Sequence, residues 1–185
     1  MKKFILLLAI LLLTTPILAD SGNCPKGGDF ALKINIPGFG AAFESLQYLA
    51  DLYSVGIIYH LSDGVFMRGS FLFNKYDNDN GSSRTYLGGS LDILFALSRI
   101  NSLTLYAGPG FSFITDNNGD NDGEGDDAFT AQIKLGVQYN LTKNLAIFGD
   151  FGFGMLQVNS FNGGLQKSST YLGTFGAFAG LAFYL

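Results

Sequence analysis

The most regular segment of this sequence runs from Ala128 to Leu141, where apolar and polar residues alternate one by one. Its apolar set is Phe129, Ala131, Ile133, Leu135, Val137, Tyr139 and Leu141. A period of two predicts a β-strand with one apolar face. Strands of soluble proteins usually have about five or six residues. This segment is longer, and its length fits a tilted strand that crosses a bilayer, which needs about 9–11 residues.

The same alternation recurs in seven further segments, which brings the predicted number of strands to eight. These segments are Asp29–Ile36, Tyr53–Leu61, Val65–Lys75, Arg84–Leu97, Ser102–Ile114, Leu145–Val158 and Thr174–Leu185. Residues Ala41–Asp51 are ambiguous, because their apolar positions also fit one face of a short helix.

The predicted connections alternate in length. Tight turns are expected at Ser62–Gly64, Ser98–Asn101 and Thr142–Asn144, where residues that favour turns are concentrated. The longer polar connections are Pro37–Ala50, Tyr76–Ser83, Thr115–Asp127 and Asn159–Ser169. Short turns at one end and long loops at the other are typical of strands that run up and down across a bacterial outer membrane.

The first residues have the character of a secretory signal peptide. Lys2 and Lys3 precede an apolar run from Phe4 to Leu13, and Ala19 is a small residue suited to cleavage. We therefore divide the chain into a signal peptide, residues 1–19, and a barrel domain, residues 20–185. Cys24 is the only cysteine, so no internal disulfide can form.

The composition favours a membrane strand protein over a soluble domain. Charged residues make up only 14% of the chain, against about 25% in soluble domains. Outside the signal peptide no apolar stretch is long enough for a membrane helix. Without such a helix, a chain in the membrane must form a closed barrel, because only closure pairs all backbone N–H and C=O groups within lipid. Without Lys2 and Lys3, nine basic residues face 15 acidic ones, a charge of −6 that argues against nucleic acid as a partner.

The alternation also assigns the two faces of the wall. The polar positions are mostly small or uncharged, which suits a narrow lumen better than the water-exposed surface of a lipocalin-like carrier. Inward glycines are expected to make room for large inward side chains such as Tyr86, Tyr106 and Phe178. Two outward aromatic girdles are predicted, one of Tyr59, Phe95, Tyr139 and Phe183 near the turns, and one of Phe73, Phe113, Phe129 and Tyr171 near the loops.

The signal peptide, eight alternating segments, three tight turns and aromatic-rich final strand together resemble the small outer-membrane β-barrel family typified by OmpA and OmpX. The resemblance covers essentially the whole chain after the signal peptide. It implies an all-β fold, an eight-stranded antiparallel up-and-down transmembrane β-barrel, in the outer membrane of a Gram-negative bacterium. The family includes adhesion, defence, structural and lipid-modifying members, so the fold alone does not name the function.

Strand parity predicts a group of charges inside the barrel. Lys33, Arg68, Asp92, Lys134 and Asp150 come from five different predicted strands and all fall on the inner face. An eight-stranded barrel leaves little room for bulk water, and an unpaired buried ion costs several kcal/mol. We therefore predict that these side chains form a hydrogen-bonded network that blocks the lumen.

Two other features of the sequence suggest possible sites. Asn118, Asp120, Asp122 and Glu124 lie in an acidic loop that matches the first half of a calcium-binding loop, but the twelfth position is Phe129 instead of a glutamate. We expect at most weak calcium binding there and assign no metal site. His60, with Ser62 and Asp63, could suggest a hydrolase, but it precedes a tight turn and no Gly-X-Ser-X-Gly motif is present.

These observations lead to a functional hypothesis. The chain is expected to be a non-enzymatic, monomeric barrel without a cofactor, in contact with outer-membrane lipid, with a closed lumen and a structural or surface-interaction role carried by its loops. The alternative is a narrow porin-like channel for small solutes, and a lipid-modifying outer-membrane enzyme is a further one.

Overall fold

The protein was analysed as a computed structural model, which describes residues 24–36, 54–77, 83–118, 125–162 and 165–185. These residues form eight strands: β1 Phe30–Ile36, β2 Ser54–Ser62, β3 Val65–Asp77, β4 Ser83–Ile100, β5 Leu103–Asn118, β6 Gly125–Asn140, β7 Leu145–Asn162 and β8 Leu165–Tyr184. The predicted signal peptide and the ambiguous segment Ala41–Asp51 lie outside the described residues.

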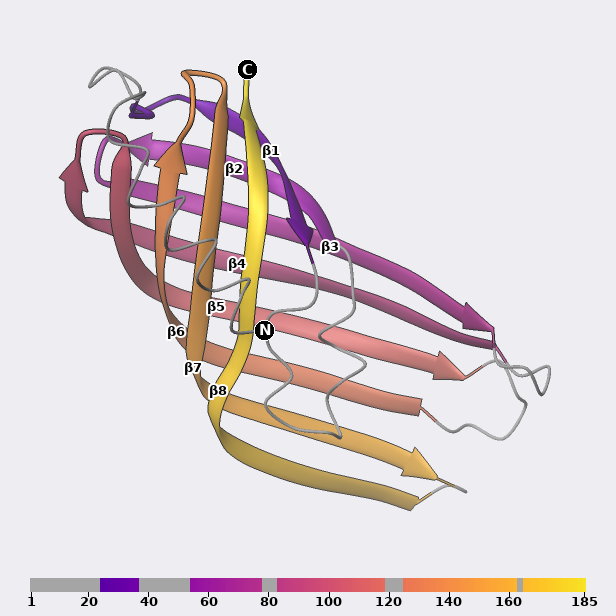
Figure 1. The fold of residues 1–185 in the computed structure, drawn as a ribbon. Coiled ribbons are helices and arrows are strands. Elements are labelled where there is room, and N and C mark those ends of the chain that lie inside the picture. Colours follow the sequence, from indigo (N-terminus) through magenta and orange to yellow (C-terminus); the bar gives the residue numbers. More distant parts are fainter. Residues whose placement is uncertain (1–23, 37–53, 78–82, 119–124, 163–164) are drawn as a thin grey trace, which may run out of the picture.

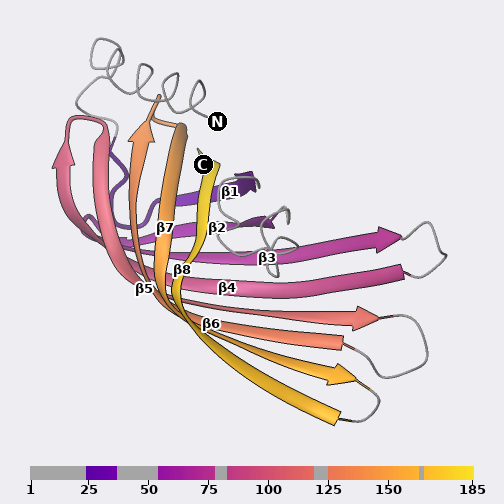
Figure 2. The same cartoon turned by 60° about the horizontal axis from the view of Figure 1, so that its bottom comes forward.

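The strands form a closed antiparallel barrel in which each strand pairs with its neighbours in sequence. Closure is made by the first and last strands, where Ala31–Ile36 of β1 pair with Ala179–Tyr184 of β8. The predicted eight-stranded up-and-down barrel is thus confirmed. Figures 1 and 2 show that β3–β8 run well past the ends of the shorter β1 and β2. The described residues contain no helix of the length and apolarity that crossing a bilayer requires.

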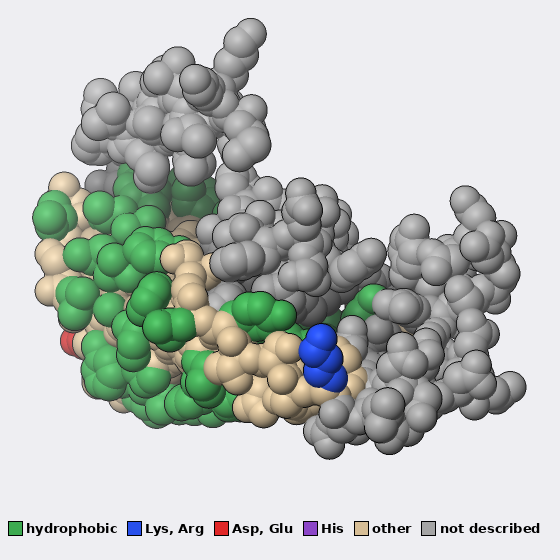
Figure 3. All heavy atoms as spheres, turned by 90° about the horizontal axis from the view of Figure 1, so that it is seen from below, with side chains coloured by type: hydrophobic (Ala, Val, Ile, Leu, Met, Phe, Trp, Pro, Cys, Tyr) green, Lys and Arg blue, Asp and Glu red, His purple; other side chains and the backbone are tan. Residues whose placement is uncertain are grey.

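The outer face of the wall carries an apolar belt. The belt begins next to the short turns. We call this end of the barrel the turn end. The belt ends toward the opposite, loop end at Phe73, Leu87, Phe113, Phe129, Met155 and Leu172, all of which are exposed. Beyond these residues, the outward side chains that the structure describes are polar or charged, as at Asp127, Asn159 and Ser168. Figure 3 shows hydrophobic side chains covering much of the described surface on one side of the molecule.

The height of the belt matches a bilayer. In β6 it extends from Phe129 to Tyr139 and in β5 from Leu103 to Phe113, and about 9–11 tilted residues are needed to cross the hydrocarbon core. Six of the eight predicted girdle aromatics are exposed on this outer face: Tyr59, Phe73, Phe95, Phe113, Phe129 and Phe183. Tyr139 is half-buried.

The C-terminal strand departs from the predicted pattern. The pairing of β7 with β8 shifts register between Phe151 and Gly152, so Phe175 is paired with Gly152 and Tyr171 with Leu156. Leu156 is fully buried on the inner face, and directly paired residues of an antiparallel sheet share a face. The prediction that Tyr171 belongs to the outer girdle is therefore wrong, because a bulge reverses the faces of all residues before it.

Most strands are longer than predicted. β7 and β8 continue through the expected loop Asn159–Ser169 and leave only residues 163–164 between them. The turn expected at Ser98–Asn101 is also shorter, because β4 passes a register shift at Ala96–Ser98 and continues to Ile100. Asn101 then makes the turn with a φ of 54°, a left-handed conformation that asparagine adopts more readily than most residues.

Candidate functional site in the barrel lumen

Four charged side chains meet in the middle of the lumen. Arg68 lies between two carboxylates, with its Nη1 atom 2.7 Å from Asp150 Oδ2 and its Nη2 atom 3.2 Å from Asp92 Oδ2. On the other side of Asp92, Lys134 Nζ lies 2.8 Å from Oδ1. Tyr106 accepts a hydrogen bond from Arg68 and donates one of 3.0 Å to Asp150 Oδ2. We call Arg68, Tyr106, Asp92, Lys134 and Asp150 the charge network.

The register of the sheet explains how these side chains reach one another. Arg68 and Asp92 are direct cross-strand partners on β3 and β4. Tyr106 and Asp150 are separated by one strand, and the residue between them in the same row is Gly136. A Cβ atom at Gly136 would lie only 2.6 Å from the Tyr106 ring and 2.5 Å from Asp150 Cβ. The missing side chain at Gly136 is therefore what allows Tyr106 to lie across β6 and reach Asp150.

A second glycine has the same role on the opposite side of the network. Gly110 of β5 is the cross-strand partner of Asp92. A Cβ atom there would lie 2.5 Å from Asp92 Oδ1 and 2.9 Å from Lys134 Cε. The ion pair between β4 and β6 therefore passes directly over Gly110. Both contacts join strands that are not neighbours, so the network spans the inside of the wall.

Lys33, the fifth charge expected in this group, is placed differently. Its side chain is buried like the other four, but among the described residues no ion pair joins it to a carboxylate. Its Nζ atom lies 6.0 Å from the centre of the Phe148 ring, which also contacts Arg68. Lys33 is thus next to the charge network without being paired in it.

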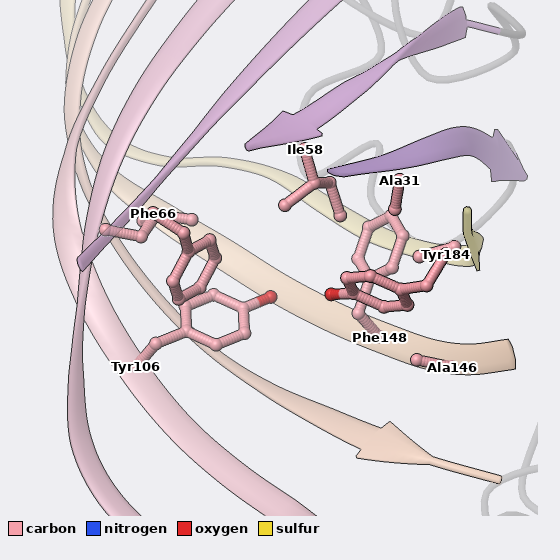
Figure 4. Close-up of a cluster of buried hydrophobic side chains, with 9 residues drawn as sticks. Ala31, Ile58, Phe66, Tyr106, Ala146, Phe148 and Tyr184 are labelled. Atoms are coloured by element: carbon pink, nitrogen blue, oxygen red, sulfur yellow. The ribbon is translucent and has the colours of Figure 1, made fainter. Parts of the chain in front are cut away.

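Below the network, toward the turn end, the lumen is filled by large side chains. Tyr106 packs edge-on against Phe66 at 5.3 Å, and Phe66 stacks on His60 at 5.0 Å. Figure 4 shows Phe66, Tyr106 and other buried side chains projecting into the interior from the surrounding strands. The hydroxyl of Tyr184 lies 3.1 Å from His60 Nε2 and accepts a hydrogen bond from Gln138. His60 is therefore held between the ring of Phe66 and the hydroxyl group of Tyr184.

The residues before β1 close the turn end. Gly27 N donates to Asp63 in the turn between β2 and β3, and Pro25 accepts a hydrogen bond from Arg99 of β4. The thiol of Cys24 donates to the carbonyl oxygen of Asn101, in the turn between β4 and β5. Because β1 and β5 lie on opposite sides of an eight-stranded barrel, residues 24–29 cross the opening. We call them the N-terminal strap.

The chain is similar to known outer-membrane proteins. Its sequence matches the family described as outer membrane protein beta-barrel domain over residues 5–183. The chain belongs to this family. A search of the curated proteins found no match.

Solved structures show the same fold for this outer-membrane barrel. The N-terminal β-barrel domain of OprF from Pseudomonas aeruginosa has 22% identity and a TM-score of 0.50, with 87% of this chain and 100% of that chain covered. OprG, an outer membrane protein of the same organism, has 13% identity and a TM-score of 0.52, with 86% and 97% covered. Identities this low support the fold alone.

Sequence reasoning missed parts of the lumen. It placed Tyr106 inside the barrel but did not connect it to the charges. The glycine at position 136, in the next predicted strand, could have indicated that the Tyr106 side chain extends across that strand. The strap had no signal, because Cys24 and Pro25 lie before the first alternating segment.

The acidic loop remains a prediction. Asn118 is the last residue of β5, whereas Asp120, Asp122 and Glu124 lie outside the described residues. Within the residues that the structure covers, no group of His, Cys, Asp or Glu could hold a metal ion. We expect calorimetry to detect no calcium binding tighter than about millimolar. A micromolar site that Asp120→Asn and Asp122→Asn abolish would contradict this expectation.

Proposed function

We propose that this protein is a closed, side-chain-filled barrel of a Gram-negative outer membrane, exported by its signal peptide, with a structural or surface-interaction role at its loop end. The observation that carries the proposal is the charge network, which joins four strands through ion pairs inside the wall. A pore for solutes would need a continuous polar path along the axis, and this network lies across it.

Two further layers support a blocked lumen. Below the network, the rings of Phe66 and His60 stack on each other, and both are buried. The N-terminal strap then covers the turn end, where it is bound to two different turns. Because an eight-stranded barrel is only wide enough to be filled by its own side chains, the two layers and the charge network together oppose passage of a hydrated solute.

The loop end is the part suited to a partner. There β4–β8 extend past the apolar belt, and described residues on their outer face are polar, for example Asp127, Asn159 and Ser168. Loops and strand tips held by a rigid scaffold commonly carry recognition. We propose an extracellular partner at this end, contact with outer-membrane lipid along the belt, a monomeric state, and no enzymatic activity or cofactor.

The proposal predicts that the wild-type protein shows no steady single-channel conductance in planar bilayers. Insertion must be verified in the same preparation, because an uninserted protein is also silent. A folded barrel migrates differently on a gel before and after boiling, and this shift provides the control. Reproducible ohmic steps from inserted protein would contradict the closed lumen and support the porin-like alternative.

A further inference from the structure

The charges buried in the lumen do not balance. Among the described residues, the buried bases are Lys33, Arg68 and Lys134, apart from His60, and the buried acids are Asp92 and Asp150. When all five are ionised, one positive charge has no counterpart. An uncompensated ion inside a protein costs several kcal/mol unless another group neutralises it.

The excess charge can be assigned to Lys33. Arg68 and Lys134 each have a carboxylate within 3.2 Å, whereas the contact of Lys33 is with the face of Phe148 at 6.0 Å. At that distance the ring quadrupole is at the limit of its effect. The aromatic ring therefore offsets only part of the cost of burying the ammonium group.

The direction of the Lys33 side chain is set by a glycine. Lys33 of β1, Gly56 of β2 and Ser70 of β3 form one row of cross-strand partners on the inner face. A Cβ atom at Gly56 would lie 2.9 Å from Lys33 Cε and 2.9 Å from Ser70 Cα. The lysine thus extends over β2 toward the inner face of β3, where Ser70 and Arg68 are two residues apart.

Two other hydrogen-bond donors at this position have no partner. The hydroxyl of Ser70 and the Nε atom of Arg68 are both buried, and neither forms a hydrogen bond. Buried polar groups are nearly always satisfied, so each such group calls for an explanation. Here three groups able to donate, an ammonium, a guanidinium N–H and a hydroxyl, come from β1 and β3 to the same section of the lumen.

We propose that a small inorganic anion of the size of chloride binds in the lumen between Lys33, Arg68 and Ser70. Such an ion brings the buried charge to zero and accepts hydrogen bonds from all three donors. The small size follows from the width of an eight-stranded barrel, whose interior is filled by side chains. The site is independent of whether the loop end binds a partner.

The first test compares chloride with gluconate, an anion too large for this position. The full barrel is folded into lipid vesicles and unfolded with urea over a series of chloride concentrations, with gluconate keeping the total salt constant. An ion that binds only the folded state raises the unfolding midpoint with its concentration. We expect chloride to raise the wild-type midpoint and to have no such effect on Lys33→Met.

Lys26→Met is the matched control, because Lys26 is an exposed lysine of the strap and its loss changes the net charge equally. This variant should respond to chloride as the wild type does. An equal response of wild type and Lys33→Met, or no response of the wild type, would overturn the proposal.

A second measurement does not depend on the folding of the lysine variant. Crystals of the wild-type barrel grown in bromide should show an anomalous peak beside Lys33 Nζ, and crystals of Ser70→Ala should show a weaker peak. Ser70→Ala keeps all buried charges and removes one unpartnered donor. Absence of the peak from wild-type crystals would contradict an anion site.

Discussion

Replacement of Asp92 by alanine is expected to lower the free energy of unfolding by about 3–5 kcal/mol, the cost of breaking a buried ion pair from one side. Asp92 is in contact with both Arg68 and Lys134. Among the residues that the structure describes, its removal leaves Asp150 as the only buried acid beside the buried bases. Because the chain has no tryptophan, the folded fraction is best followed by gel migration during urea unfolding in vesicles.

Two variants show whether the loss comes from the charge network. Asp127→Ala removes an exposed carboxylate from the outer face of β6 and should change stability by less than about 0.5 kcal/mol. The double variant Asp92→Ala with Lys134→Met returns the buried charge to that of the wild type and should recover part of the stability. If Asp92→Ala and Asp127→Ala cost the same, the network does not contribute as we describe.

Leu135→Arg is the second change with a large expected effect. Leu135 lies on the outer face near the middle of the apolar belt of β6. An arginine at the bilayer midplane of a membrane barrel costs about 2–4 kcal/mol, whereas near the interface it costs about 0–1 kcal/mol. We expect Leu135→Arg to shift the urea midpoint accordingly in a bilayer.

Asp127→Arg is the control for depth. It places the same side chain on the same face of the same strand, beyond the belt. Its cost should fall in the interface range or below. Similar costs for the two arginines would mean that the belt is not the lipid-facing surface.

The alternation of residues predicts strands and faces only where the two faces differ. In β6, the apolar residues Ile133, Leu135 and Val137 lie on the outer face, and the polar residues Gln132 and Lys134 lie on the inner face. Past the belt, both faces meet water, and the pattern disappears. For this reason the expected loop Asn159–Ser169 gave no sign that β7 and β8 continue as strands through most of it.

The residue pattern does not predict the bulge in β8, for a different reason. Around it the sequence reads Phe175-Gly176-Ala177-Phe178, and these apolar or small residues fit either face of a narrow barrel. A one-residue shift of register in such a stretch places no polar residue on the lipid-facing side, so the residue pattern does not reveal it. Its consequence appears only farther along the strand, at Tyr171, whose face is reversed.

The charges of the lumen illustrate a similar limit. Parity can place a side chain on one face of a strand, but contact between strands depends on register. Parity places Arg68 and Asp92 on the inner face, but only the register shows that the hairpin pairs them directly. The unpaired state of Lys33 depends on Gly56 and on the direction of a long side chain, neither of which alternation describes.

The pairing of β1 with β8 has a consequence for assembly. The wall is completed by the first and last strands of the chain, so every partly inserted form has two open sheet edges. Backbone groups on such edges cannot remain unpaired in hydrocarbon. The open edges must therefore be shielded from lipid until Ala179–Tyr184 are available to pair with β1. The barrel cannot close before its final strand has reached the membrane.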